Sequence, residues 1–137
     1  MFSHIFVSVS DFERAFAFYK ALMENLGNEL RFTEPSKPWA GWHSEGQSRP
    51  FFVIGKPHNG RPHHPSNGQM VAFLAASRVQ VRAAHEAGLA HGGTCEGPPG
   101  LRPQYHANYY GAYLRDPEGN KLGIACHVAE PQSDNAT

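Results

Sequence analysis

The stretch YHANYYGAYLRDPEGN, residues 105–120, decides the fold. Aromatic and apolar residues dominate positions 109–114 and predict a β-strand over Tyr109–Arg115. Asp116-Pro117-Glu118-Gly119-Asn120 then combines the residue types that favour a tight turn. A second apolar run, Lys121–Val128, follows at once, so the stretch predicts an antiparallel hairpin.

The chain begins with another strand, followed by a helix. Residues 3–9 alternate in polarity and are rich in β-branched side chains, which predicts a strand. Ser10 with Glu13 fits a capping box, and Asp11 is the alternative N-cap. Apolar residues then recur every three or four positions, which predicts an amphipathic helix that ends at Gly27.

The same order of elements occurs a second time, because Met70 opens a strand-like run 66 residues after His4. Ser77 with Gln80 repeats the capping box, and the apolar spacing beyond it predicts a second helix that ends at residues 91–93. An offset of 66 residues is close to half of the 137-residue chain. Order of elements is what an internal duplication retains longest, so the sequence indicates two related halves.

Short strands are predicted after each helix, so that each half is a β-α-β-β-β module. We expect one domain over residues 1–128, with modules 1–56 and 68–128, a linker at 57–67 and a polar tail at 129–137. Two such modules can share a curved sheet, with the helices on its outer face and a ligand cleft on its inner face. The predicted strands are Glu29–Glu34, Trp39–His43, Phe51–Gly55, Gly93–Glu96, Tyr109–Arg115 and Lys121–Val128.

Composition argues against several classes of function. The chain holds 12 Lys and Arg against 12 Asp and Glu, and a net charge of zero argues against a nucleic-acid binder. No apolar run approaches the roughly 18–20 residues of a membrane span, and the N-terminus lacks the pattern of a signal peptide. Cys95 and Cys126 do not make a disulfide framework, so we expect a reducing, cytoplasmic setting.

These features resemble the vicinal oxygen chelate superfamily, which includes glyoxalase I, extradiol dioxygenases and bleomycin-resistance proteins. Residues 105–120 look like the C-terminal hairpin of glyoxalase-like proteins, and His4, Asp11 and Phe18-Tyr19 look like their opening. The resemblance covers about residues 2–128. It implies an α+β fold in which two βαβββ modules form a curved mixed sheet with a cleft, and a homodimer that takes a small-molecule ligand.

Enzymes of that superfamily hold one divalent metal, and the resemblance assigns its ligands to four positions. They are a His or Gln on the first strand of each half and an acid on the last strand of each half. Here these positions are His4, Met70, Gly123 and the strand 51–54, which contains no acid. A thioether and a missing side chain are poor ligands for Zn, Ni, Fe or Mn, so a metal held by His4 is possible but disfavoured.

A polar-aromatic cluster in residues 105–113 is the best candidate for chemistry without that metal. Strand alternation places Tyr109 and Tyr113 on one face. We predict His106 and Tyr109 as catalytic residues, with His106 as acid or base. The alternative is that these are ordinary strand tyrosines with their hydroxyls in water. Other polar and aromatic side chains are predicted to bind the ligand: His4, Trp39, Trp42, Phe52, Met70, Tyr105 and Tyr113.

Three functions remain open at this level. The first is a glyoxalase-like enzyme that acts on a small molecule in a lyase, isomerase or dioxygenase-type reaction. The second is a metal-free protein that binds and sequesters a small molecule, as resistance-type relatives do, and the missing metal ligands and the aromatic residues favour it. The third is a domain whose surfaces serve assembly alone.

Overall fold

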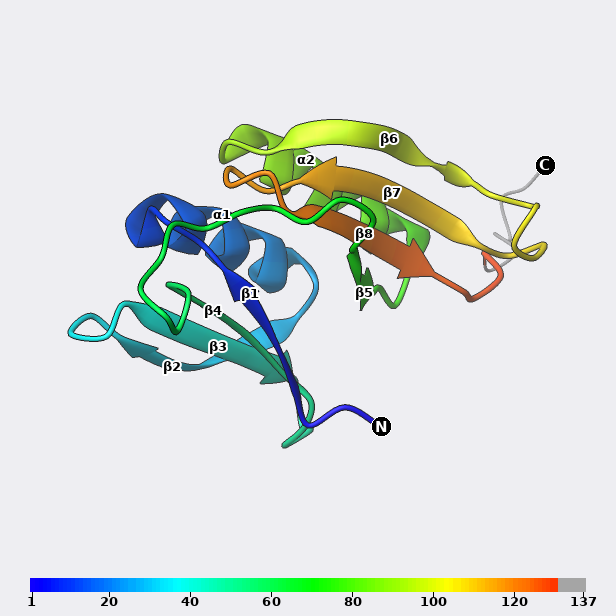
Figure 1. The fold of residues 1–137 in the computed structure, drawn as a ribbon. Helices are drawn as coiled ribbons and strands as arrows, with labels where there is room; N and C mark the ends of the chain where they lie inside the picture. Colours follow the sequence, from blue (N-terminus) through cyan, green and yellow to red (C-terminus); the bar gives the residue numbers. More distant parts are fainter. Residues whose placement is uncertain (131–137) are drawn as a thin grey trace.

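Figure 1 shows the computed structural model, which describes residues 1–130. This part of the chain consists of two βαβββ modules, which confirms the predicted α+β class and order of elements. Neither of its two helices is long and apolar enough to cross a membrane. The elements are β1 (His4–Ser8), α1 (Phe12–Asn25), β2 (Asn28–Glu34), β3 (Trp39–Ser44) and β4 (Phe51–Gly55), then β5 (Val71–Leu74), α2 (Arg78–Ala90), β6 (Thr94–Leu101), β7 (Tyr110–Arg115) and β8 (Lys121–Cys126).

Each module forms its own four-stranded mixed sheet. The strand orders are β1-β4-β3-β2 and β5-β8-β7-β6, with the first and last strands of each module parallel and the other pairs antiparallel. The strand order is the same in both sheets, which matches the repeated order of elements in the sequence. Among residues 1–130, no strand of one sheet pairs with a strand of the other, so the curved sheet is built as two adjoining sheets.

Two strand ends in the second module differ by two residues or more from those predicted. β6 continues through Gly97-Pro98-Pro99-Gly100, a segment whose composition predicts a loop. Pairing with β7 overrides that local preference, although the register shifts on both sides of Gly97. β8 ends at Cys126 rather than at Val128.

α1 begins and ends at residues that have specific capping roles. The side chain of Asp11 accepts a hydrogen bond from the backbone N–H of Arg14 at 3.2 Å, so Asp11 is the N-cap and the predicted Ser10–Glu13 box does not form. Gly27 follows the helix with a φ of +74°, the left-handed conformation that glycine adopts readily. The buried face of α1 consists of Ala15, Phe18, Tyr19, Leu22 and Met23.

α2 begins with a variant of the predicted capping box. Ser77 accepts a hydrogen bond from the backbone N–H of Gln80 at 3.1 Å, and the Gln80 side chain accepts one at 2.8 Å from the residue just ahead of the cap. Gly88 lets this helix lie close to its neighbours. A Cβ there would lie 2.5 Å from Cδ1 of Leu114 and 3.2 Å from Cε2 of Phe18.

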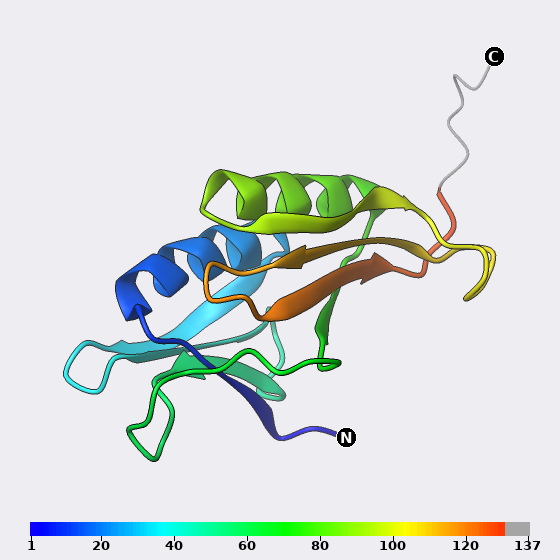
Figure 2. The ribbon, with the colours of Figure 1, turned by 45° about the horizontal axis from the view of Figure 1, so that its top comes forward.

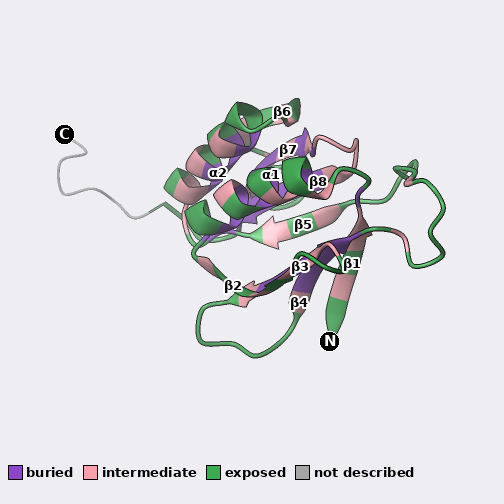
Figure 3. Ribbon diagram, turned by 90° about the vertical axis from the view of Figure 1, so that its left-hand side faces the viewer, coloured by how far each residue is buried: buried purple, intermediate pink, exposed green. Residues whose placement is uncertain are grey.

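The two helices pack against each other between the two sheets (Figure 2, Figure 3). Each sheet turns one face toward them, and these faces form a single apolar core together with the helices. Phe52 of β4 and Phe73 of β5 meet edge to face where the sheets adjoin, with ring centroids 4.9 Å apart. Within residues 1–130 the opposite face of each sheet has no helix over it, and we call these two surfaces the free faces.

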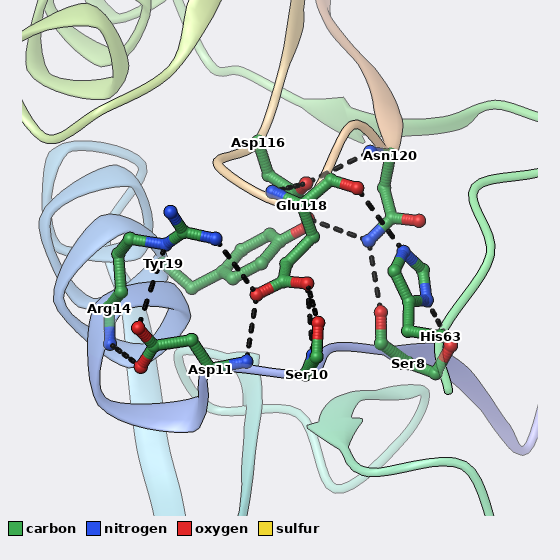
Figure 4. A network of polar contacts seen from close by, with 9 residues as sticks. All are labelled: Ser8, Ser10, Asp11, Arg14, Tyr19, His63, Asp116, Glu118 and Asn120. Atoms are coloured by element: carbon green, nitrogen blue, oxygen red, sulfur yellow. Dashed lines mark hydrogen bonds and ion pairs between the residues drawn. The ribbon is translucent and has the colours of Figure 1, made fainter. Parts of the chain in front are cut away.

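A polar network fastens the β7–β8 turn to the first module (Figure 4). Glu118, whose side chain is 3% exposed, accepts hydrogen bonds from the backbone N–H groups of Ser10 at 3.0 Å and Asp11 at 2.9 Å, and from the Ser10 hydroxyl. The Arg14 guanidinium donates another at 3.3 Å. Burial by itself raises the pKa of this carboxyl, but the donors outweigh it and lower the pKa to about 2.

Asp116 holds the same turn from the other side. The phenol of Tyr19 in α1 donates to its carboxylate, and the Asn120 side chain donates to it at 2.8 Å. Asn120 also donates to the backbone carbonyl of Ser8 at 3.0 Å, and His63 of the linker hydrogen-bonds to the Ser8 hydroxyl. The turn therefore joins β1, α1 and the linker to the second module.

Replacing Glu118 with glutamine should lower the free energy of unfolding by about 1–3 kcal/mol at neutral pH, because it removes the charge and replaces one of the two acceptor oxygens with an NH2 group that cannot accept. The carboxylate contributes its full stability above the ordinary pKa of 4.5 and loses it as the pH falls toward about 2. The difference between wild type and Glu118→Gln should therefore shrink over that interval in urea-unfolding curves. Glu86→Gln, at an exposed position on α2, is the matched control. Equal stability of wild type and Glu118→Gln at neutral pH would contradict this role.

Candidate functional site

The free face of the second sheet carries the tyrosines that the sequence indicates. Ala112 and Leu114 of β7 are buried in the core, so Tyr113 points to the opposite side. Tyr109, the residue just before the strand, lies beside Tyr113, with 3.0 Å between their phenol oxygens. The ring of Tyr105 packs against that of Tyr109 at a centroid distance of 4.9 Å. Three of the predicted site residues thus come together on one surface.

Two cations flank the Tyr113 ring. The Arg102 guanidinium and the Lys121 ammonium each lie 5.7 Å from the ring centroid. Burial, and then the hydrogen bond with Tyr109, raises the pKa of the Tyr113 phenol above 10.0, although Arg102 acts in the opposite direction. The phenol is therefore protonated at neutral pH and can donate a hydrogen bond.

His106 and His127 form a second hydrogen-bonded pair next to the tyrosines. His106 Nε2 lies 2.9 Å from His127 Nδ1, and the backbone N–H of Asn108 donates to His106 Nδ1 at 3.1 Å. Because Nδ1 of His106 accepts, the hydrogen bonds assign its proton to Nε2, which donates to His127. The neutral His127 ring then carries its proton on Nε2, which hydrogen-bonds to no residue in the described part of the chain. The Tyr109 ring contacts both imidazoles, at centroid distances of 5.7 and 5.2 Å.

These five residues, Tyr105, His106, Tyr109, Tyr113 and His127, are called the tyrosine–histidine cluster below. His127, Arg102 and Lys121 are absent from the sequence-based prediction. The strand register could have predicted the position of His127, because the pairing of Tyr110 with Cys126 places His127 beside Tyr109. Arg102 follows Gly97-Pro98-Pro99-Gly100, whose composition predicts a loop, whereas β6 extends to Leu101 and so places Arg102 at the end of a strand.

The four positions of the expected metal site do not make a ligand set. Met70 and Gly123 do lie together, since a Cβ at Gly123 would be 3.4 Å from the Met70 sulfur and 3.3 Å from the Tyr113 ring. His4 is exposed on β1 and hydrogen-bonds to the Ser3 hydroxyl, and β4 contains no acid. Within residues 1–130, no three His, Cys, Asp or Glu side chains gather closely enough to hold a metal ion. The residues at these positions therefore do not fit a divalent cation.

The aromatic residues of the first module that are predicted to bind the ligand lie on different sides of the first sheet. Trp42 and Phe52 are 2% and 7% exposed and pack with Tyr19 in the core. Trp39 lies on the free face and packs against Phe32, with ring centroids 4.8 Å apart. Residues three apart on a strand face opposite sides, so the two tryptophans do not form one wall.

Replacing Tyr109 with phenylalanine should lower the pKa of Tyr113 toward 10.0, because the hydrogen bond to Tyr109 contributes to its elevation. NMR titration of protein labelled at the tyrosine ring carbons would measure it. Tyr110→Phe, which removes a hydroxyl bonded to Arg82, is the control and should leave the Tyr113 titration unchanged. An unaltered Tyr113 titration in Tyr109→Phe would show that the phenol pair does not form in solution.

Comparisons with known proteins agree with this architecture. The family model described as Glyoxalase/Bleomycin resistance protein/Dioxygenase superfamily matches residues 1–124. The crystal structure of a glyoxalase/bleomycin resistance protein from Albidiferax ferrireducens T118 is 41% identical, with a TM-score of 0.81, over 92% of this chain and 98% of that chain. A search of curated proteins gave no match.

More distant structures share the fold. A glyoxalase-related enzyme from Fulvimarina pelagi is 19% identical, with a TM-score of 0.70, over 100% of this chain and 95% of that chain. A lactoylglutathione lyase from Agrobacterium tumefaciens is 21% identical, with a TM-score of 0.60, over 92% of each chain. With the family model matched over residues 1–124, this chain belongs to the glyoxalase/bleomycin resistance protein/dioxygenase superfamily.

Proposed function

We propose that this chain binds a small, planar, oxygen-bearing molecule on the free face of its second sheet. The observation that carries this proposal is the placement of two hydrogen-bonded pairs on one surface, Tyr109 with Tyr113 and His106 with His127. Membership of a superfamily whose members typically bind small molecules supports a ligand of this size.

The cluster offers three kinds of contact to such a ligand. The rings of Tyr105 and Tyr109 present aromatic faces against which a planar group can pack. Either phenol of the Tyr109–Tyr113 pair can turn from its neighbour to a ligand oxygen, because a hydroxyl rotates to suit its partner. Arg102 and Lys121 add positive charge beside the same surface.

We infer that binding does not use the metal position of the superfamily. Met70 supplies a thioether and Gly123 supplies no donor, so His4 would be the single conventional ligand among those positions. A single imidazole competes poorly with water for a divalent cation. The chemistry of the donors therefore favours contacts between the ligand and phenol and imidazole groups. His4 remains a predicted ligand contact.

We also propose that the chain acts as a homodimer in the cytoplasm. β1 and β5 are edge strands, and exposed edges of this kind are usually covered. Large apolar side chains beside them are exposed, with fractions of 58% for Phe2, 44% for Met70 and 73% for Leu74. Cys95 and Cys126 are both free thiols, which suits a reducing compartment.

A thermal-shift screen of planar aromatic compounds with hydroxyl or carbonyl oxygens should yield ligands that stabilise the protein equally with and without a chelator. Tyr109→Phe and Tyr113→Phe keep the rings and remove the hydroxyls, so each should lower the affinity of a ligand bound at this site about tenfold. Tyr110→Phe is the matched control. Ligands that bind only after Zn, Ni, Mn or Fe is added would overturn the metal-free mode, and ligands indifferent to both variants would overturn the site.

A second candidate function, proton transfer in a lyase- or isomerase-type reaction, is favoured by the histidine pair. Both ring nitrogens of His106 are engaged, by Asn108 and by His127. The proton available to a ligand is then the one on His127 Nε2, and His106 orients that ring. In this candidate, His127 exchanges the proton and Tyr109 or Tyr113 hydrogen-bonds to the reacting oxygen.

This candidate predicts that some ligands from the screen exchange a carbon-bound hydrogen with deuterium from the solvent, as followed by NMR. Replacing His127 with glutamine should slow that exchange about 100-fold while the affinity stays within a few-fold, because general acid–base catalysis contributes on that scale. His58→Gln, at an exposed linker position, is the control. Unchanged exchange in His127→Gln would rule out its role as the proton-transfer group.

A further inference from the structure

The free face of the first sheet carries a β-bulge with a specific effect on two side chains. Leu30 pairs with Trp42, but Phe32 pairs with the next residue of β3, Gly41, so Arg31 is an extra residue in β2. Without the bulge, Phe32 would face the helix side. Its ring lies instead over Gly41, where a Cβ would be 2.5 Å from Phe32 Cε1.

An open pocket of about 440 Å³ lies at this bulge. Its other walls come from β3, from the loop that follows β3, and from the first residue of β4. The residues that line it, called the arginine pocket below, are Arg31, Phe32, His43, Ser48, Arg49 and Phe51. The bulge thus places a cation and an aromatic ring, adjacent in sequence, in the wall of one pocket.

The pocket carries positive charge that no carboxylate lining it neutralises. The Arg49 guanidinium lies 4.1 Å from the centroid of the Phe51 ring and donates to the backbone carbonyl of Ser48. The side chain of Arg31 makes no hydrogen bond or ion pair with any residue from 1 to 130. Glu29, 53% exposed, is not among the lining residues, and its carboxylate lies 3.8 Å from His43 Nε2.

We propose that the arginine pocket binds an aromatic ring that carries a carboxylate or a phosphate group. Guanidinium groups match the oxygens of carboxylate and phosphate, and two of them, Arg31 from β2 and Arg49 from the loop after β3, line this pocket. The rings of Phe32 and Phe51, whose centroids are 6.4 Å apart, supply an apolar surface for the flat part of the ligand. The Ser48 hydroxyl and the His43 ring add hydrogen-bonding groups at the rim.

This site is separate from the tyrosine–histidine cluster, because it lies on the other module and shares no residue with it. Its existence does not depend on the function proposed for the second sheet. Arg102 provides the internal comparison, since it is an arginine beside an aromatic ring on the free face of the second sheet.

Calorimetric titration with benzoate and with phenyl phosphate tests the proposal, and the two probes distinguish carboxylate from phosphate recognition. At least one should bind saturably and more tightly than benzyl alcohol, which lacks the charge, and acetate, which lacks the ring. Arg31→Gln and Arg49→Gln should each weaken that binding about tenfold, and added salt should weaken it further. Arg61→Gln, at an exposed position in the linker, is the matched control and should bind like wild type.

Four results would overturn the proposal. The first three are an absence of saturable binding of both anions up to about 10 mM, an affinity for benzyl alcohol equal to that for the anions, and undiminished binding in Arg31→Gln and Arg49→Gln. The fourth is a loss of binding in Arg102→Gln while both pocket variants still bind like wild type. Arg31 and Arg49 are exposed, so the variants should fold normally, and thermal melts that coincide with wild type would verify this.

Discussion

The carboxylate of Glu118 links the two modules, between which residues 1–130 form no strand pairing. Its side chain is almost fully buried, and its four donors come from the segment between β1 and α1 and from the first turn of α1, more than 100 residues away in sequence. A buried charge is tolerated only when it is hydrogen-bonded on this scale, so the position of the β7–β8 turn relative to α1 is fixed within narrow limits. Tyr19 connects this polar joint to the core, because its ring packs among the aromatic residues while its hydroxyl reaches Asp116.

The position of the helices has a direct effect on where chemistry can occur. Both lie between the sheets, and the apolar side chains of both modules are used in one core. The polar and aromatic residues of the opposite faces are left to meet solvent, a ligand or a second molecule. The two surfaces have become different: the first combines arginine with phenylalanine, and the second combines tyrosine with histidine.

Local patterns in the sequence predicted most of the elements, because caps and alternation act over a few residues. They failed for the second half of β6, where pairing with β7 stabilises Gly97-Pro98-Pro99-Gly100 as a strand against its composition. The cluster of Tyr105, His106 and Tyr109 could be predicted for a similar reason, since its members are close in the chain. The partners of Glu118 could not be predicted, because they depend on the packing of one module on the other.

The aromatic residues of the first sheet illustrate a different limit. The alternation of side chains along a strand is enough to place Trp39 and Trp42 on opposite faces, and it could have been applied to both residues. What it cannot supply is which side the helix covers, and a bulge reverses the assignment for every residue beyond it. Phe32 reaches the free face for that reason alone.

The single core shared by the modules also bears on how such a repeat evolves. A module on its own would leave one side of its helix and part of its sheet uncovered, so the two halves are expected to unfold as one cooperative unit. Substitutions in the core must then satisfy both halves at once. Substitutions on either free face affect neither the core nor the other face, so one half can acquire a new ligand preference while its twin retains an older one.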